Sequence, residues 1–385
     1  MERRVYLQIP GPTNIPERVL RALSRPNLNH RGPEFRALVR EVVAGLKHVF
    51  QTQNGAVLIF PGSGSGAMEA AIVNTLSPGD RVLALRNGHF SHRFAAIAAA
   101  FGLQVDHLDW EWGRAVDPNQ VRAVLQADRE HRIKAILITH NETSTGVTND
   151  VRAVSVIRRE LGHPALLLVD AVSSLGCIDL PFDAWDLDVV VTGCQKGLML
   201  PPGLAIVAVS ERAWEAVERA RLPRWYWDFR PARARLAEGL FPYTPAQSLF
   251  FGLKEALAMF REEGLQNVFA RHRRLAQGIR AGAQALSLKM LADERYASNS
   301  VTALYLPAGV SFEALADRLR EGYGVIIAGG LGRLEGKIFR IGHLGRLHIT
   351  DVLAILAALE GALLDLGLPV TPGAAVAAAR QAMQD

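Results

Sequence analysis

Two ionisable residues stand at the carboxyl ends of two consecutive apolar runs. Asp170 ends the run Leu166-Leu167-Leu168-Val169, and Lys196 lies on the glycine-flanked loop Gly193-Cys194-Gln195-Lys196-Gly197 that follows the run 188–192. Open α/β sheets bind ligands at this edge. A lysine in an apolar site has a lowered pKa and becomes a usable amine nucleophile or base. The pair therefore places one amine and one half-buried carboxylate at the same edge of a sheet.

This pair has the chemistry that pyridoxal 5′-phosphate requires. The cofactor needs a lysine for a Schiff base and a carboxylate for its pyridinium nitrogen. Taken singly, Lys196 could be an ordinary solvated lysine, and Asp170 could be a helix cap or half of a salt bridge. Together they are more specific, and we expect both to be catalytic with pyridoxal phosphate as the cofactor.

A glycine-rich segment, Pro61–Glu69, follows one predicted strand and opens a predicted helix. Its glycines let the backbone approach an anion, the helix N-terminus supplies free N–H groups, and Ser63 and Ser65 add hydroxyls. A dinucleotide turn is the alternative, because Gly62, Gly64 and Ala67 loosely fit its spacing. That motif also needs an acidic residue ending a strand about 20 residues on, which is missing here. We therefore expect a phosphate site.

A third polar segment, Asn141–Gly146, follows the apolar run Ile133–Thr139 at the same edge of the sheet. It could contribute to the site or be an ordinary turn with helix caps.

Apolar runs alternate with helical patterns through the first two thirds of the chain. Continuous apolar strands separated by helices are typical of a mostly parallel sheet that is covered on both faces. The fold class is therefore α/β. The predicted strands are Ala56–Phe60, Arg81–Arg86, Ile133–Thr139, Ala165–Asp170, Val189–Thr192 and Ala205–Val209, and the predicted helices between them include Gly66–Leu76, Arg93–Phe101 and Asn149–Leu161.

The pattern changes after about residue 255, where long amphipathic helices dominate. Leu265–Ala285 and Phe312–Glu321 predict helices, and Val301–Tyr305 and Gly324–Ala328 predict short strands. We therefore expect an N-terminal arm over residues 1–19, a large cofactor-binding domain over 20–255, and a smaller α+β domain over 256–385.

The composition limits the function classes. The 385 residues include 43 basic and 38 acidic residues, and no basic stripe with interleaved aromatics suggests nucleic-acid binding. The two cysteines, Cys177 and Cys194, do not form a disulfide framework. We find no signal peptide and no apolar stretch that would span a membrane, so we expect a cytoplasmic protein that handles small molecules.

The ordered motifs resemble the class V aminotransferases of the aspartate-aminotransferase-like fold (pyridoxal-phosphate fold type I). Within that family they are most similar to the alanine–glyoxylate and serine–glyoxylate (serine–pyruvate) aminotransferases. The resemblance covers nearly the whole chain. It is carried by Gly11–Pro16, His30–Phe35, Ser63–Gly66, Glu142–Gly146, Val169–Ser174, Gly193–Gly197 and Arg340–His343.

The resemblance implies roles around the cofactor ring. Lys196 would form the Schiff base and then shuttle the proton between the substrate and the cofactor, and Asp170 would keep the pyridinium protonated. Val172 would pack on one face of the ring. Phe90 would stack on the other face, where family members with tryptophan offer a larger surface.

The resemblance also implies a phosphate site and a second subunit. Ser65, Gly66 and Gln195 would hold the phosphate, while Ala67 stands where relatives often carry histidine, so one contact is missing. Thr244, within Phe241–Pro245, matches a segment that reaches the phosphate from the other subunit. This use would require a homodimer with active sites at the subunit interface, and Tyr243 could contribute there in place of a tyrosine at 241.

Substrate contacts are implied at Gly11, Thr143 and Arg340. Thr143 would bond near the ring hydroxyl or the substrate carboxylate. Arg340 would clamp the α-carboxylate with two parallel hydrogen bonds, which a lysine could not make. Its alternative is a surface ion pair, which the apolar neighbours in Ile338–Gly342 argue against.

We expect transfer of the amino group of alanine or serine to glyoxylate or pyruvate. Pyridoxamine–pyruvate and ureidoglycine–glyoxylate aminotransferases share the scaffold and remain alternatives. A cysteine desulfurase or lyase fits less well, because neither Cys177 nor Cys194 is placed on a loop over the cofactor. A nicotinamide-dependent dehydrogenase or a binding protein without catalysis is the hypothesis from another class.

Overall fold

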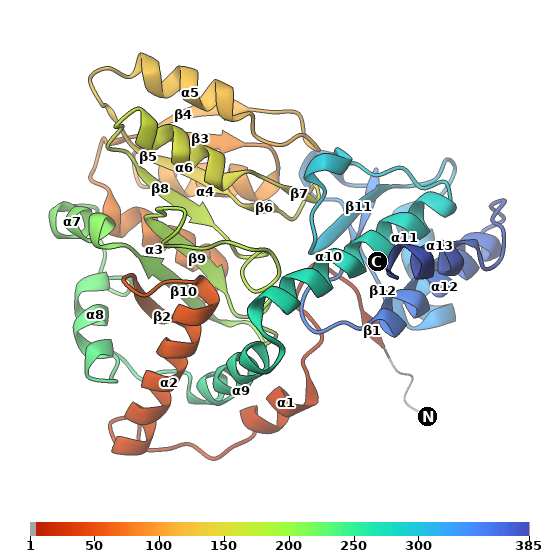
Figure 1. Ribbon diagram of the computed structural model, residues 1–385, viewed down its shortest axis with the longest axis horizontal. Coiled ribbons are helices and arrows are strands. Elements are labelled where there is room, and N and C mark those ends of the chain that lie inside the picture. Colours follow the sequence, from red (N-terminus) through yellow and green to blue (C-terminus); the bar gives the residue numbers. More distant parts are fainter. Residues whose placement is uncertain (1–4, 385) are drawn as a thin grey trace.

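The computed structural model describes residues 5–384, and a seven-stranded sheet is its largest element (Figure 1). All neighbouring strands are parallel except β10, which runs antiparallel to both β2 and β9. The α/β prediction with a mostly parallel sheet is therefore confirmed. In spatial order the strands are β2 (Ala56–Gly62), β10 (Gly203–Val209), β9 (Val189–Gly193), β8 (Leu166–Asp170), β5 (Ile133–Thr139), β3 (Arg81–Arg86) and β4 (Gln104–Asp109).

Both faces of this sheet are buried, which explains the continuous apolar strands. Val57 and Ile59 of β2 belong to the core on one face, and Leu58 and Phe60 to the core on the other, because side chains alternate along a strand. The first face is covered by α2 (Pro33–Phe50), α5 (Pro118–Ala127), α6 (Val151–Glu160) and α9 (Gln247–Glu263). The second is covered by α3 (Gly64–Thr75), α4 (His89–Ala100), α7 (Glu211–Arg219) and α8 (Phe229–Ala237).

The elements after α9 form a smaller layered unit, seen at the right of Figure 1. Its antiparallel sheet has the order β11 (Val301–Tyr305), β14 (Ile338–Gly342), β13 (Ala328–Gly329). A third core lies between this sheet and helices α10 (Leu265–Ala285), α11 (Phe312–Arg318), α12 (Ile349–Asp365) and α13 (Ala374–Ala382). The domain boundaries at residues 19 and 255 stay a prediction.

The N-terminal segment joins the two units. Its strand β1 (Tyr6–Leu7) pairs in parallel with β12 (Val325–Ile326) of the smaller unit, and its helix α1 (Glu17–Leu23) packs on α9. Between them, Gly11 and Thr13 pass the loop that carries Lys196. Within the arm predicted over residues 1–19, the described residues 5–19 form a strand, a loop and the start of a short helix, and residues 1–4 lie outside the described part of the chain.

Two elements of the smaller unit differ from their predictions. The stretch Gly324–Ala328 contributes to β12 and β13, which belong to different sheets. The helix expected over Phe312–Glu321 ends at Arg318 and continues as a π-helical turn, Leu319–Tyr323. Within residues 5–384, no helix has both the length and the apolar character needed to cross a membrane.

Candidate active site

The topology brings Asp170 and Lys196 together at the carboxyl ends of two central strands of the large sheet. Asp170 is the last residue of β8, and Lys196 follows β9 by three residues. These strands are parallel neighbours, with Asp170 opposite Val191. Their carboxyl ends therefore meet, as the sequence predicted.

The Lys196 side chain is half-buried beneath the N-terminal segment. Its Nζ donates a hydrogen bond to the carbonyl oxygen of Pro10. A Cβ on Gly11 would lie 2.4 to 2.8 Å from three atoms of this lysine, and Gly11 has a φ of +93°, so only glycine fits here. The pKa of Lys196 is lowered to about 8, mainly by burial and also by Arg340 and Arg93, while Asp170 opposes the shift. The amine is thus available as a nucleophile near neutral pH.

Asp170 is a buried carboxylate held by neutral hydrogen-bond donors. It is 3% exposed, and its Oδ1 accepts from the Val172 amide (2.9 Å) while Oδ2 accepts from Thr139 Oγ1 (3.3 Å). No Lys or Arg among the described residues forms an ion pair with it. Burial raises the pKa of Asp170 to about 7, with Glu142 adding to the rise. A carboxylate held this way suits a cationic ring nitrogen.

The predicted phosphate loop forms the N-terminus of α3. Ser63 caps the helix by accepting from the Gly66 amide (3.4 Å), and Ser65 and Gly66 lie in the first turn, whose N–H groups are not used within the helix. A Cβ on Gly64 would lie 2.6 Å from Val172, and one on Gly66 would lie 2.7 Å from the Trp227 indole. The loop therefore packs tightly between Val172 and Trp227, and sequence analysis had not placed Trp227 at the site.

Gln195 lies beside this loop. Its Oε1 is buried without a hydrogen-bond partner, and it lies 2.7 Å from the position that a Cβ on Gly193 would take. The amide orientation is interchangeable, so an uncommitted buried amide can turn its NH₂ toward an anion. The Gln195 amide and the helix N-terminus would suit the cofactor phosphate, and Asp170 would suit the ring nitrogen. The residues present therefore fit pyridoxal phosphate.

Arg340 reaches the site from β14 of the smaller unit. It is 6% exposed, its Nε donates to the Gly329 carbonyl (2.9 Å), and its Nη1 donates to the Thr143 carbonyl (3.2 Å). Its Nη2 makes no hydrogen bond within the described chain, and no carboxylate there pairs with the guanidinium. Burial lowers the pKa of Arg340 to about 10. The alternative prediction, a surface ion pair at Arg340, is therefore wrong. One edge of the guanidinium is free for a carboxylate ligand.

The polar loop 141–146 caps a helix and also contacts Arg340. Thr143 donates from Oγ1 to Ser173 Oγ (2.6 Å) and contacts Arg340 through its carbonyl. Glu142 is fully buried and caps α4, because its carboxylate accepts from the amides of Phe90 (3.1 and 3.2 Å) and Ser91 (2.9 Å). Phe90 is half-buried in the first turn of α4. Glu142 thus connects Phe90, the expected stacking ring, with the loop that contacts Arg340.

Thr244 is not brought to the other predicted residues. It is exposed in the segment between α8 and α9 and forms no hydrogen bond with them in the described chain. Tyr243 instead donates from its hydroxyl to the Tyr226 carbonyl and stacks on the Tyr226 ring at 4.6 Å. A role for Thr244 would require a second copy of the chain.

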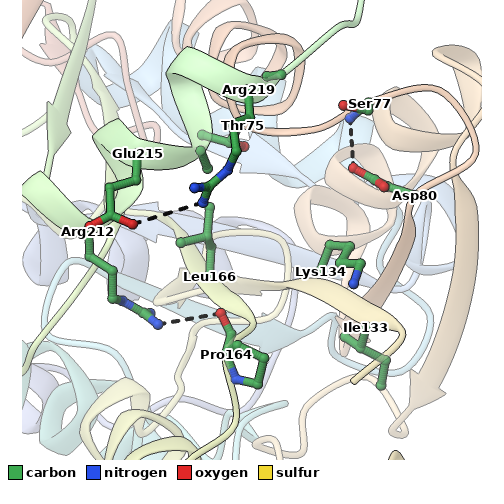
Figure 2. Close-up of a pocket in the computed structure, with 12 residues that line it drawn as sticks. Thr75, Ser77, Asp80, Ile133, Lys134, Pro164, Leu166, Arg212, Glu215 and Arg219 are labelled. Atoms are coloured by element: carbon green, nitrogen blue, oxygen red, sulfur yellow. Dashed lines mark hydrogen bonds and ion pairs between the residues drawn. The ribbon is translucent and has the colours of Figure 1, made fainter. Parts of the chain in front are cut away.

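A separate hollow of about 490 Å³ lies at the amino ends of the strands, opposite the carboxyl ends that carry Asp170 and Lys196 (Figure 2). It is lined by the starts of β5 and β8, at Ile133 and Leu166, and by α7. Its arginines are already paired, Arg212 with Asp188 (2.8 Å) and Arg219 with Glu215 (3.9 Å). None of the predicted site residues lines this hollow, so it is not part of the site.

The sequence matches a known protein family over most of its length. The profile described as "Aminotransferase class-V" matches residues 5–333. The chain belongs to the class V aminotransferases. L-aspartate–glyoxylate aminotransferase of Paracoccus denitrificans is 46% identical over 97% of this chain and 94% of its own length. Serine–glyoxylate aminotransferase of Methylorubrum extorquens is 42% identical over 99% of this chain and 96% of its own.

Solved structures agree with this class V assignment. Ureidoglycine–glyoxylate aminotransferase from Bacillus subtilis superposes with a TM-score of 0.93 at 29% identity, covering 100% of this chain and 99% of that one. Pyridoxamine–pyruvate aminotransferase from Mesorhizobium loti has a TM-score of 0.93 at 32% identity, covering 98% and 97%. The predicted family and the type I fold are confirmed, and membership of class V implies dependence on pyridoxal phosphate.

Proposed function

We propose that this aminotransferase uses pyridoxal phosphate bound to Lys196 to transfer the amino group of a small amino acid, alanine or serine, to glyoxylate or pyruvate. The observation that carries the proposal is the buried pair at the carboxyl ends of β8 and β9: an amine with a pKa of about 8 and a carboxylate that forms no ion pair among the described residues. When bound, the cofactor supplies an electron sink for the bonds of the substrate α-carbon.

The protein residues would bind the substrate and move a proton. The free edge of Arg340 would hold the α-carboxylate, with Thr143 and Gly11 beside it. The Lys196 amine would take the proton from the α-carbon and deliver it to the cofactor. Asp170 would hold the ring nitrogen, Val172 and Phe90 the two ring faces, and Ser65, Gly66 and Gln195 the phosphate.

The names of the relatives support glyoxylate as an acceptor, since both sequence relatives above are glyoxylate aminotransferases. Their named donors differ, aspartate in one and serine in the other. The free guanidinium edge of Arg340 accounts for one carboxylate, the α-carboxylate, which is the only carboxylate that alanine and serine carry. A desulfurase is disfavoured: Cys177 and Cys194 are buried, and burial raises the pKa of each to about 11, which leaves no thiolate near neutral pH.

Replacing Lys196 tests the central assignment. We expect Lys196→Ala to lose the near-visible absorbance of the covalently bound cofactor and to lower turnover by at least about 100-fold, because it removes both the nucleophile and the proton carrier. Lys254→Ala, which removes a surface lysine paired with Glu41, is the matched control and should keep both. Full transaminase activity in Lys196→Ala would refute the proposal.

A half-reaction screen tests the substrates. The enzyme is mixed with alanine, serine, aspartate or pyridoxamine without an acceptor, and the loss of the near-visible band is followed. Glyoxylate or pyruvate is then added to restore it. We expect alanine or serine to react fastest and glyoxylate to restore the band. A faster reaction with aspartate or with pyridoxamine would replace the proposed donor.

A further inference from the structure

Arg93 is a half-buried cation beside the cofactor site that lacks an anionic partner. It lies on α4, one turn after Phe90, and no ion pair among the described residues includes it. Its three contacts are neutral: Nη1 donates to Ser65 Oγ (3.1 Å), Nη2 lies 3.3 Å from His89 Nε2, and the guanidinium carbon lies 4.9 Å from the Phe90 ring centroid. A partly desolvated guanidinium held only by neutral groups indicates a missing anion.

The contact with Ser65 indicates where that anion binds. Because the guanidinium donates to Ser65 Oγ, the serine hydroxyl proton stays free to donate to another group. Ser65 lies in the first turn of α3, where the helix end favours an anion. The groups expected to hold the phosphate, namely Ser65, Gly66, Gln195 and Thr244, are all neutral. Among the described residues, Arg93 is the only cationic side chain that hydrogen-bonds one of them.

The contact with Phe90 adds a second link. Residues three apart on a helix share one face, so the Arg93 guanidinium covers the Phe90 ring. Arg93 thereby connects the phosphate loop on α3 with the expected stacking ring on α4.

The charges around Lys196 agree with this arrangement. Both Arg340 and Arg93 lower the pKa of the lysine, so two guanidinium groups act on one amine. Arg340 has an assigned anion, the substrate carboxylate. Asp170 acts on the lysine in the opposite direction and raises its pKa. Arg93 has no assigned anion, and the cofactor phosphate would supply one.

We propose that Arg93 is a positioning residue for the cofactor phosphate, which orients the Ser65 hydroxyl toward it and supplies the positive charge that the neutral phosphate contacts lack. This inference rests on the proposed function, since it requires that the site binds pyridoxal phosphate.

The test compares pyridoxal phosphate with pyridoxal, which has the same ring and aldehyde but no phosphate. Both are titrated into cofactor-free protein, and binding is followed by absorbance and by quenching of tryptophan fluorescence. Arg93→Met keeps the apolar stem over Phe90 and removes the charge. It should weaken binding of pyridoxal phosphate by at least about tenfold, and that of pyridoxal by less than about threefold. Arg93→Lys keeps the positive charge but loses the planar guanidinium. Its affinity for pyridoxal phosphate should lie between those of the unaltered protein and Arg93→Met.

Arg86→Met is the matched control. Arg86 ends β3, and its guanidinium is paired with Asp109 (2.6 and 2.7 Å) rather than with a residue of the phosphate loop. It should leave both affinities unchanged, which separates the loss of a specific contact from a general loss of positive charge.

Three results would overturn the inference. Equal losses for the two ligands would mean that Arg93 acts only by packing on Phe90. Unchanged affinity for pyridoxal phosphate, with turnover lost for aspartate but kept for alanine, would assign Arg93 to the substrate side chain. Failure of the unaltered protein to bind pyridoxal phosphate would overturn the proposed function itself and this inference with it.

Discussion

The pKa values of two titratable groups at the centre of the site are shifted toward neutral pH from opposite directions. Burial disfavours the charged form of each, so it raises the pKa of Asp170 to about 7 and lowers that of Lys196 to about 8. Their mutual attraction opposes both shifts but does not cancel them. Arg340 adds to the shift of the lysine. The site therefore prepares an amine that can react without a separate base.

This shift predicts how cofactor uptake depends on pH. Only the neutral amine attacks an aldehyde, and the lowered pKa of Lys196 increases the fraction of neutral amine near neutral pH. The initial rate of cofactor incorporation into cofactor-free protein should rise with pH and level off above about 8, rather than above 10.5, the ordinary value for lysine. Stopped-flow absorbance at a series of pH values measures it. Because Arg340 lowers the pKa of Lys196, Arg340→Met should move the midpoint to higher pH. A midpoint near 10.5 in the unaltered protein would contradict the assignment.

At the scale of elements, the N-terminus of α4 is fixed by a residue about fifty positions away in the sequence. The Glu142 carboxylate accepts from the Phe90 and Ser91 amides, and it also accepts from the Ser144 hydroxyl (2.6 Å). A carboxylate at a helix N-terminus interacts favourably with the helix dipole and satisfies N–H groups that the helix leaves free. A Cβ on Gly88 would lie 2.2 Å from the Glu142 side chain, so glycine is needed to admit it.

Removing this charge should loosen α4. Glu142→Gln keeps the shape but replaces one accepting oxygen by an NH₂ group that faces backbone donors. We expect the free energy of unfolding to fall by about 1 to 3 kcal/mol and the affinity for pyridoxal phosphate to fall with it, because Phe90 loses its support. Urea unfolding and cofactor titration measure the two effects. Glu130→Gln, on the exposed Glu130–Arg132 pair, should change stability by less than about 0.5 kcal/mol. Equal effects of the two substitutions would contradict the role of Glu142.

The same helix shows what sequence could and could not predict. Strands β3 and β5 have the predicted bounds, because strands buried on both faces are continuous apolar runs. The start of α4 was predicted four residues late, since its cap is Glu142 rather than a neighbouring side chain. Strand β4 was missed because it is a polar edge strand in which no residue is buried, so it lacks a continuous apolar run. The sheet edge and its amine and carboxylate were predictable, whereas Arg93 and Trp227 depend on contacts between distant elements.

At the scale of the whole molecule, the site is assembled where the two units meet. Arg340 comes from the small sheet and bonds to Thr143 on a loop of the large sheet. The N-terminal segment covers Lys196 between β1, which pairs in the small unit, and α1, which packs on α9. The only predicted site residue left outside this assembly is Thr244, which is exposed on the large unit.

If the site is completed by a second subunit, Thr244 must act across the interface, and subunit mixing can test this. Lys196→Ala loses the nucleophile, and Thr244→Asp places a negative charge against the phosphate. In a mixed dimer, one site would combine both defects, while the other would keep Lys196 of one subunit and Thr244 of its partner. Co-expression of the two variants under separate affinity tags should therefore restore activity that neither variant has alone. If Thr244 served its own subunit, every site in the mixed dimer would carry one defect, and activity would not return.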